Sequence, residues 1–427
     1  MTKDLKLVPH FGLITLTIYG VGDILGAGIY ALVGKIAGIA GSWIALSFLI
    51  AFVTASLTAM SYVKLTRAFP HAGGVAVFAD KIFKRAWLSS LVGWLMFCSC
   101  VASMATISKA FFGYLQAFAP GAAEWIVIPT FFVALAFVNW RGMRDSSAFN
   151  IVCTLVEVSG LMLVIGIGTW IVFGGSSSSE VPIAEAQMLF RQEDFAWAAI
   201  LQAAALSFYA FVGFEDLANV SEETKDPTRT VPRAIIAALA IAGVIYMIIS
   251  FIALKVVPLE TLTTSKAPLL EIVKAGFPNF PPIIFTMIAG FAVANTAFLN
   301  YITASRLLYG MSKAGLVPSA LSKLDKHRST PTTAIIVILP IVVLLALTGA
   351  IQFLAGTTAT LMLLLFIVVN ICAFHVSKTH RWAPIAAVIT NVMLIYFASY
   401  ESHRLAAVLI AFGFILFFVT RALRKKR

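Results

Sequence analysis

The chain has 427 residues, of which 60% are hydrophobic and only 12% are charged, and its mean hydropathy is +0.95. A soluble domain of this length is excluded, because so much apolar surface could not be kept away from water. The formal net charge of +12 could indicate nucleic-acid binding, but the distribution of the basic residues explains the charge without a nucleic-acid partner. We therefore expect an all-α protein integral to the lipid bilayer.

About twelve apolar stretches remain when the chain is cut at charged or turn-rich loops, and each can cross roughly 30 Å of hydrocarbon as a helix. We place these spans near 11–34, 41–63, 86–112, 124–140, 147–173, 197–217, 233–257, 281–310, 332–351, 356–377, 382–399 and 402–420. The longest polar pieces, 64–85 and 174–196, are too short to form a second domain, and the latter reads as a flexible linker. A single transmembrane domain over residues 1–427 is predicted.

The basic residues are divided unequally between the two sides of the predicted membrane. Loops on the side of the N-terminus carry 24 Lys and Arg residues, the opposite loops carry 6, and Lys109 lies inside the third span. Cytoplasmic loops of membrane proteins are enriched in Lys and Arg, so both termini are predicted to be cytoplasmic, with an even number of spans in the cell membrane.

The first apolar stretch is interrupted near its middle by a glycine cluster that runs from Gly20 through Gly22, Gly26 and Gly28. In hydrocarbon every backbone polar group needs an internal partner, so irregular backbone survives only where it is buried in protein or lines a polar cavity. Glycine also lets membrane helices pack closely. The cluster by itself is therefore explained either by a binding site or by helix packing.

Four cysteines fall within predicted spans, and no metal-ligand spacing links them to histidine. We expect them to be small packing residues, and we expect neither a metal site nor a cofactor. They are Cys98, Cys100, Cys153 and Cys372.

Glu157 stands near the middle of the fifth span, where a carboxylate costs about 2.5 to 3.5 kcal/mol on insertion scales. Such a residue should face the bundle interior or a wet cavity. Three roles remain open: a proton carrier, since burial disfavours the charged form; a sodium ligand together with hydroxyls such as Thr303 or Ser305; or a structural hydrogen bond.

A second interruption lies in the sixth span, where apolar residues run into Gly213 and then into Glu215 and Asp216. Five spans separate the two interruptions, an arrangement typical of transporters built from two inverted repeats. We assign the repeats to 11–173 and 197–377, with two extra spans over 382–420. Thr230-Val231-Pro232 is predicted to cap and start the seventh span.

Four segments together resemble permeases of the amino acid, polyamine and organocation superfamily, in the family's order and over about three quarters of the chain. They are Gly22-Asp23-Ile24-Leu25-Gly26-Ala27-Gly28-Ile29-Tyr30, Pro70-His71-Ala72-Gly73-Gly74, the stretch from Gly213-Phe214-Glu215 through Glu222-Glu223-Thr224-Lys225-Asp226-Pro227 to Pro232-Arg233-Ala234, and Ala304-Ser305-Arg306-Leu307-Leu308-Tyr309-Gly310-Met311. The resemblance implies a LeuT-like fold with two inverted five-helix repeats, two further helices, and breaks in helices 1 and 6.

The resemblance also implies that the break in the first span binds the substrate carboxylate through free backbone amides. The residues at this position are Ile24, Gly26, Ala27 and Gly28. The start of a half-helix exposes unpaired N–H groups and a positive dipole end, which suit an anion. Many relatives have Ser where this chain has Ala27, so only backbone contacts are expected there.

Carbonyl groups at the second break would bind the substrate amine, because the end of a half-helix carries negative potential. An aromatic residue is expected to cover the substrate, either Tyr209 or a neighbouring Phe. The residues implied on this side are Tyr209, Ala210, Phe211, Val212 and Gly213. Asn300 in the eighth span is expected either to line the pocket or to join helices through hydrogen bonds.

Two further acidic residues flank the breaks and are assigned to coupling or gating. Asp23 would also stabilise the unwound turn of the first break, whereas Glu215 would either cap freed amides or relay protons. At Glu157 some proton-coupled relatives carry Lys, so the coupling ion stays open between H⁺, which we favour, and sodium.

These features predict a secondary active transporter that moves an amino acid or related amine by alternating access. A sodium-coupled or exchange-type transporter and a non-transporting nutrient sensor remain alternatives, and no enzymatic constellation is found. The apolar segment 360–367 favours a neutral substrate, although a cationic one stays open. A monomer is expected, with a dimer as the alternative.

Overall fold

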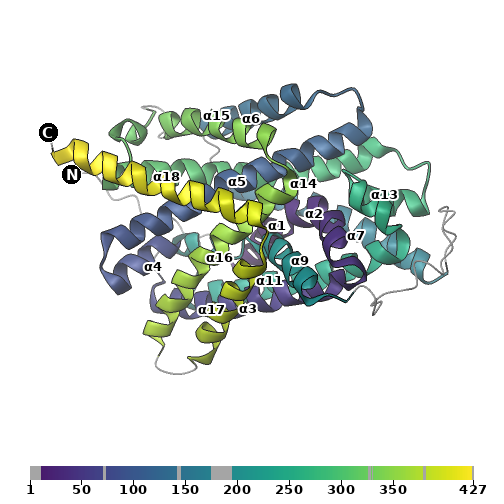
Figure 1. Ribbon diagram of the computed structural model, residues 1–427, viewed down its shortest axis with the longest axis horizontal. Helices are drawn as coiled ribbons and strands as arrows, with labels where there is room; N and C mark the ends of the chain where they lie inside the picture. Colours follow the sequence, from purple (N-terminus) through teal and green to yellow (C-terminus); the bar gives the residue numbers. More distant parts are fainter. Residues whose placement is uncertain are drawn as a thin grey trace.

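The structure is a computed structural model, and it describes residues 11–70, 74–141, 146–174, 195–325, 328, 330–377 and 381–425. Within these ranges every regular element is a helix, apart from one isolated β-bridge between Phe11 and Thr224. The helices form one bundle around a few central segments (Figure 1). The all-α prediction is therefore confirmed. The predicted serine-rich linker and His71 to Gly73 lie outside the described residues, apart from the ends of the linker.

Each predicted span corresponds to a helix or to a pair of helices. In chain order they are α1 (Leu13–Leu25), α2 (Ala27–Ala40), η1 (Gly41–Trp43), α3 (Ile44–Ala68), α4 (Gly74–Phe83), α5 (Ala86–Phe118), α6 (Glu124–Arg141), α7 (Ser146–Val172), α9 (Trp197–Ser207), η3 (Phe208–Phe211), α10 (Asp216–Asn219), η4 (Ser221–Glu223), α11 (Pro227–Val256), α12 (Leu259–Thr264), α13 (Pro268–Gly276), α14 (Pro282–Ala314), η5 (Ser319–Ser322), α15 (Thr332–Thr348), α16 (Ile351–Val376), α17 (Trp382–Phe397) and α18 (Tyr400–Lys425).

Fewer than twelve membrane crossings are counted when helix length and apolar composition are the only criteria. Eight helices in the described part of the chain satisfy both criteria, or nine if the strongly bent pair α17 and α18 counts as one span. This count treats residues 28–68 as one run and leaves out α1 and α15, which are apolar but short. Twelve spans therefore remain a prediction.

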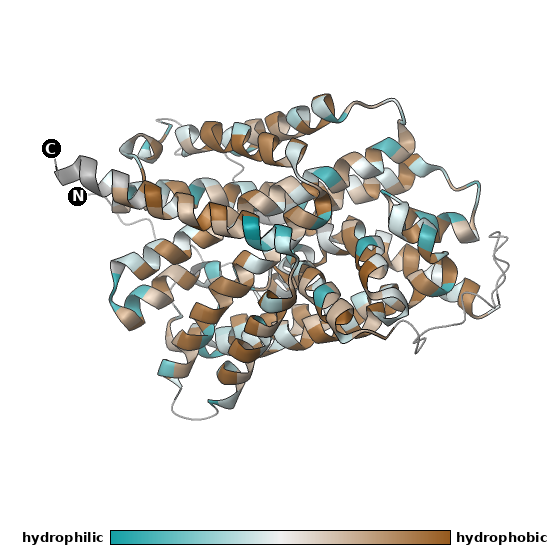
Figure 2. Ribbon diagram, in the orientation of Figure 1, coloured by the Kyte–Doolittle hydropathy of each residue, from teal (hydrophilic) through white to brown (hydrophobic). Residues whose placement is uncertain are grey.

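The outer surface of the bundle has the composition expected of a lipid contact. Large apolar side chains are exposed along the outer helices, for example Trp125 on α6 at 70% and Leu344 on α15 at 66%. Figure 2 shows hydrophobic residues, in brown, along all parts of the bundle, with hydrophilic residues interspersed. Because water would penalise such exposure, these helices fit a hydrocarbon environment.

Both predicted breaks are present in the central helices. The first separates α1 from α2 at Gly26, whose φ of −40° and ψ of −147° leave the helical region. The second replaces the end of the sixth span by a 3₁₀ turn, η3, and an extended residue, Val212, before the short helix α10. Gly213 has a φ of +134°, which L side chains rarely adopt, so glycine is required at this turn.

The two breaks lie against each other, which gives the glycines a packing role as well. A Cβ atom on Gly28 would come within 2.5 Å of the Ala210 Cα, and one on Gly213 within 2.8 Å of the Asp23 carbonyl oxygen. The beginning of α1 is also joined to the segment after α10, because the Phe11 N–H donates to the Glu223 carbonyl at 3.0 Å. The two interrupted helices therefore pack against each other.

One predicted helix start is wrong. The seventh span begins at Pro227 rather than near residue 233, and Pro232 lies inside α11. Proline fits the first turn of a helix because its missing N–H is not needed there, so Pro227 starts the helix. The Thr230 hydroxyl does not cap that start but donates to the Lys225 carbonyl at 2.7 Å.

Candidate functional site

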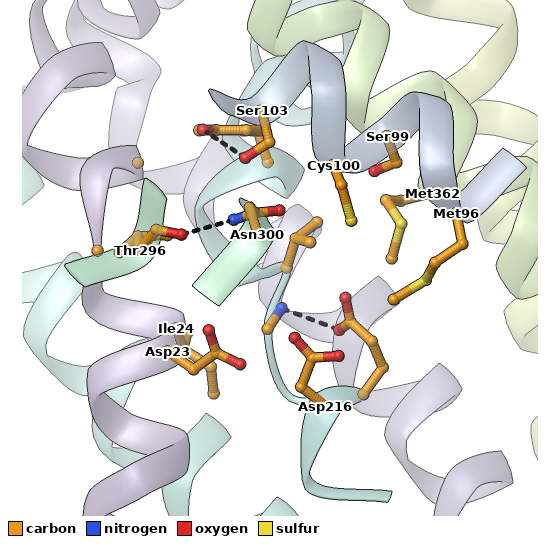
Figure 3. A pocket seen from close by; sticks show the side chains of 16 residues that line it. Asp23, Ile24, Met96, Ser99, Cys100, Ser103, Asp216, Thr296, Asn300 and Met362 are labelled. Carbon is orange, nitrogen blue, oxygen red and sulfur yellow. Dashed lines mark hydrogen bonds between the residues drawn. The ribbon is translucent and has the colours of Figure 1, made fainter. Parts of the chain in front are cut away.

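The two helix breaks line one buried cavity, which lies between α1, α2, α5, α10, α14 and α16. Its volume is about 30 Å³, enough for about two water molecules but not for an amino acid. The lining residues are Asp23, Ile24, Gly26, Gly28, Met96, Ser99, Cys100, Ser103, Tyr209, Val212, Gly213, Glu215, Asp216, Thr296, Asn300 and Met362 (Figure 3). The site is therefore closed in this conformation.

On the first side of the cavity, α1 ends and α2 begins. Ile24, Gly26 and Gly28 are cavity residues, as predicted. No side chain of the described residues caps the start of α2, and the first N–H groups of a helix lack intrahelical partners. Gly26 and Gly28 therefore bring the backbone at the start of α2 to the cavity, where a Cβ atom on either residue would collide with Thr296 or Ala210. Ala27 lies between them, but its side chain is not described.

On the opposite side, the polar groups come from η3 and the residues that follow it. Tyr209, Val212 and Gly213 line the cavity. The Tyr209 hydroxyl lies 3.2 Å from the Ser103 hydroxyl of α5, within hydrogen-bonding distance. Tyr209, the aromatic residue expected to cover the substrate, therefore lies at the cavity.

Ala210 and Phe211 do not belong to the cavity lining, although the sequence assigned them to it. The ring of Phe211 packs in an aromatic cluster with Phe48, Phe52 and Tyr246, with centroid distances of 6.5, 5.9 and 5.1 Å. Neighbouring residues of a tight 3₁₀ turn point in different directions, so only part of the segment faces the cavity.

A residue that the sequence did not indicate, Tyr246 of α11, bridges the two breaks. Its hydroxyl lies 2.6 Å from the Ile24 carbonyl oxygen and 2.9 Å from the Ala210 carbonyl oxygen. The single hydroxyl proton is shared between two carbonyls, one from each interruption. The Ala210 carbonyl, predicted to meet the substrate amine, has this internal partner. A tyrosine in an apolar span was the available signal, because its buried hydroxyl needs a partner.

Three acidic side chains meet at the cavity. Asp23 of α1 and Asp216 of α10 both line the cavity, and Figure 3 shows the two carboxyl groups facing each other. The Glu215 carboxylate accepts a hydrogen bond of 2.9 Å from the Gly213 N–H, which is one of the two roles considered for it. Asp216 was not assigned a role from the sequence, although it follows Glu215 directly.

Helix α5 contributes the largest group of cavity residues that the sequence analysis missed. Met96, Ser99, Cys100 and Ser103 follow the i, i+3, i+4, i+7 spacing of one helix face. Cys100 is buried, as expected for a packing residue, but it also lines the cavity. The pattern of small polar residues on one face was the signal that could have identified this wall.

Two more helices complete the cavity wall. Asn300 of α14 lines the cavity, and its amide donates to the Thr296 carbonyl at 2.9 Å. Thr296 belongs to α14 as well, so this hydrogen bond stays within one helix and does not join two helices. Met362 is the contribution of α16.

Glu157 lies outside the cavity, on α7. It is fully buried, and neither carboxylate oxygen has a hydrogen-bond partner among the described residues. Its backbone carbonyl accepts a 2.9 Å hydrogen bond from the Tyr30 hydroxyl of α2, just beyond the first break. Thr303 lines a different cavity and the Ser305 hydroxyl donates to the Ile302 carbonyl, so no described contact links either residue to Glu157.

A larger cavity of about 570 Å³, here called the vestibule, lies next to the site. It is bounded by α3, α4, the start of α5 and the second half of α14, and Met96 and Glu215 line both cavities. Arg306 and Asp80 contribute charges to the vestibule. Access to the closed site from this side is therefore limited by Met96 and Glu215.

The sequence of the chain is similar to those of known permeases and transporters. A family model described as amino acid permease matches residues 11–425. The branched-chain amino acid permease of Bacillus subtilis is 25% identical over 352 residues, which is 78% of this chain and 72% of the relative. The chloroplastic cationic amino acid transporter 9 of Arabidopsis thaliana is 28% identical over 345 residues, 76% and 58% of the two chains. The methylthioribose transporter of Bacillus subtilis is 26% identical over 351 residues, 77% and 73% of the two chains.

Proposed function

Because the chain belongs to the amino acid permease family, it is a multi-pass membrane transporter of amino acids rather than an enzyme, and we propose that it carries its substrate across the cell membrane by alternating access. The observation that carries the proposal is the closed cavity between two interrupted helices. Irregular backbone at this depth is costly unless it serves a cavity.

The two sides of the cavity suit the two ends of an amino acid head group. Gly26 and Gly28 offer the amides at the start of α2, which favour a carboxylate. Backbone near Val212 and Gly213 faces them from the other break and would receive the amine. Tyr209 would cover the bound substrate.

The direction of access follows from the predicted orientation, in which both termini are cytoplasmic. The vestibule then opens toward the cytoplasm, because it is lined by α4 and by Arg306, which belong to the basic loops. We assign the inverted repeats to residues 11–173 and 197–377, with one bundle rocking against the other. Separation of Met96 from Glu215 would connect the site with the vestibule.

Glu157 is proposed to couple transport to protons. An ionised carboxylate at a fully buried position without hydrogen bonds would be costly, so the group needs a proton or another cation. Its place beside Tyr30 next to the first break would let its charge state influence that break. Sodium coupling would require further oxygen ligands around Glu157 in another conformation, whereas substrate exchange would require no coupling ion.

The transport proposal is tested by counterflow in proteoliposomes loaded with single amino acids. Accumulation of labelled substrate against unlabelled internal substrate is expected, whereas a nutrient sensor would bind substrate without counterflow. Failure of every amino acid and amine to move would contradict the proposal. The same assay in detergent-free vesicles at low protein density would show whether a monomer suffices.

Coupling is tested separately with Glu157→Gln. We expect this variant to lose accumulation driven by a pH gradient while it keeps part of the exchange activity, because the amide cannot carry the proton. Glu260→Gln, at an exposed position on α12, is the matched control and should behave as the wild type. Unchanged proton-driven accumulation by Glu157→Gln would exclude the proposed role, and accumulation that depends on sodium alone would replace it.

A further inference from the structure

The acidic end of the cavity is not needed to bind an amino acid head group. The head group is accounted for by the backbone at the two breaks, whereas Asp23, Glu215 and Asp216 present three carboxyl groups to the same space. Asp23 and Asp216 both line this end of the cavity, and their side chains face one another in Figure 3. The cavity therefore has a second polar region with a chemistry of its own.

Asp23 has an unused acceptor at this position. The residue is 5% exposed, and its Oδ2 atom has no hydrogen-bond partner among the described residues. Glu215 and Asp216 are better satisfied, because they accept hydrogen bonds from the Gly213 N–H and from the Asn219 amide at 2.9 and 2.8 Å. A buried acceptor without a partner favours a ligand that brings a donor.

The charge of the cavity is unbalanced. Among the residues that the structure describes, its lining contains no lysine, arginine or histidine. Arg306 lines the neighbouring vestibule and is exposed there, where solvent screens its charge. Carboxyl groups that share a small space without a counter-ion favour a positively charged occupant.

We propose that Asp23 and Asp216, assisted by Glu215, form a binding site for a second cationic group of the substrate, and that the substrate is a dibasic amino acid. This inference rests on the proposed function, which places the carboxylate and the α-amine at the breaks. The side-chain ammonium or guanidinium group then occupies the acidic end. Both groups carry several N–H donors, which can satisfy the free Asp23 oxygen and bridge it to Asp216.

The spacing of the two regions fits such a substrate. Asp23 lies on α1 three residues before Gly26, the residue at the break, and three residues of a helix rise about 4.5 Å along its axis. The methylene chain of a lysine can cover this distance. Met96, Cys100 and Met362 provide an apolar wall for such a chain. The apolar segment 360–367 favoured a neutral substrate, but Met362 is the residue of this segment that lines the cavity. The expectation of a neutral substrate therefore loses its main support.

The experiment compares four ligands by isothermal titration or thermal shift with the purified full-length protein. Lysine carries both recognition elements, norleucine lacks the side-chain amine, cadaverine lacks the carboxylate, and leucine is a neutral reference. We expect lysine to bind about tenfold or more tightly than norleucine, the loss that accompanies one missing close charge pair. Cadaverine should also bind more weakly than lysine.

The acidic site is tested directly with Asp216→Asn and Asp23→Asn. Each should lower the lysine affinity by about tenfold or more and leave the norleucine affinity nearly unchanged. Asp216→Glu keeps the charge and should retain most of the preference for lysine. Asp80→Asn removes an exposed carboxylate that lines the vestibule, so it is the matched control and should change neither affinity.

Several results would overturn the inference. Equal affinity of the wild type for lysine and norleucine would exclude a second cationic site without any variant. A response to sodium or to pH alone, with no preference for lysine, would show that the carboxyl groups hold only an inorganic cation or a proton. Counterflow of neutral amino acids without lysine would leave the proposed function intact and reject the dibasic substrate, whereas absence of any amino acid counterflow would reject both.

Discussion

Replacing Tyr246 by phenylalanine should disturb both helix breaks at once. The variant keeps the ring that packs against Phe48 and Phe211, but it removes the hydroxyl that lies 2.6 Å from the Ile24 carbonyl and 2.9 Å from the Ala210 carbonyl. Loss of this shared donor leaves a buried carbonyl acceptor unsatisfied, which costs about 1–3 kcal/mol. If this free energy destabilises the backbone conformation of the two breaks that binds substrate, the apparent affinity decreases by about 5- to 150-fold.

A second buried tyrosine separates this local effect from general destabilisation. The Tyr301 hydroxyl donates to the Ile335 carbonyl at 2.8 Å, between α14 and α15 and away from the breaks. Tyr301→Phe should lower the unfolding temperature to a similar extent as Tyr246→Phe but leave substrate affinity unchanged. Thermal unfolding and a substrate titration by thermal shift measure both quantities. Equal affinities of Tyr246→Phe and the wild type would refute the role of Tyr246 as a bridge.

Two further substitutions test the backbone and the aromatic cover. Gly213→Ala should destabilise the protein by about 1–3 kcal/mol in a thermal unfolding assay, because alanine is strained at a φ of +134° and its Cβ would meet the Asp23 carbonyl. The control is Gly166→Ala on α7, which has open space around it and should be neutral or stabilising in the same assay. Ser103→Ala removes the 3.2 Å partner of the Tyr209 hydroxyl. We expect the binding free energy of the substrate to weaken by roughly 0.5–1.5 kcal/mol in a titration. An unchanged affinity would show that the hydroxyl contact does not position the ring.

The helix breaks could be predicted because their signals are local. Glycine in the middle of an apolar span conflicts with the demand for an unbroken helix, and both Gly26 and Gly213 lie at backbone positions that are not helical. Asp23, Glu215 and Asn300 were found for a similar reason, since polar groups are rare within spans. The residue type and its position within a span were therefore enough to select these candidates, without knowledge of which residues surround them in the fold.

The remaining parts of the site depend on contacts that are distant in sequence. Tyr246 is 222 residues from Ile24, so no local pattern indicates that its hydroxyl meets that carbonyl. Cys100 and its neighbours on α5 have side chains that also suit ordinary packing, and only the assembled bundle shows which face meets the cavity. The true start of α11 at Pro227 was missed because several residues nearby could begin a helix.

The position of a bound substrate tests the central proposal most directly. A structure determined in lipid nanodiscs with a transported amino acid should show density between the breaks, with the carboxylate within hydrogen-bonding distance of the amides at Gly26 and Gly28. The amine should face the backbone near Val212. Substrate density confined to the vestibule, with the cavity between the breaks still closed, would contradict the account.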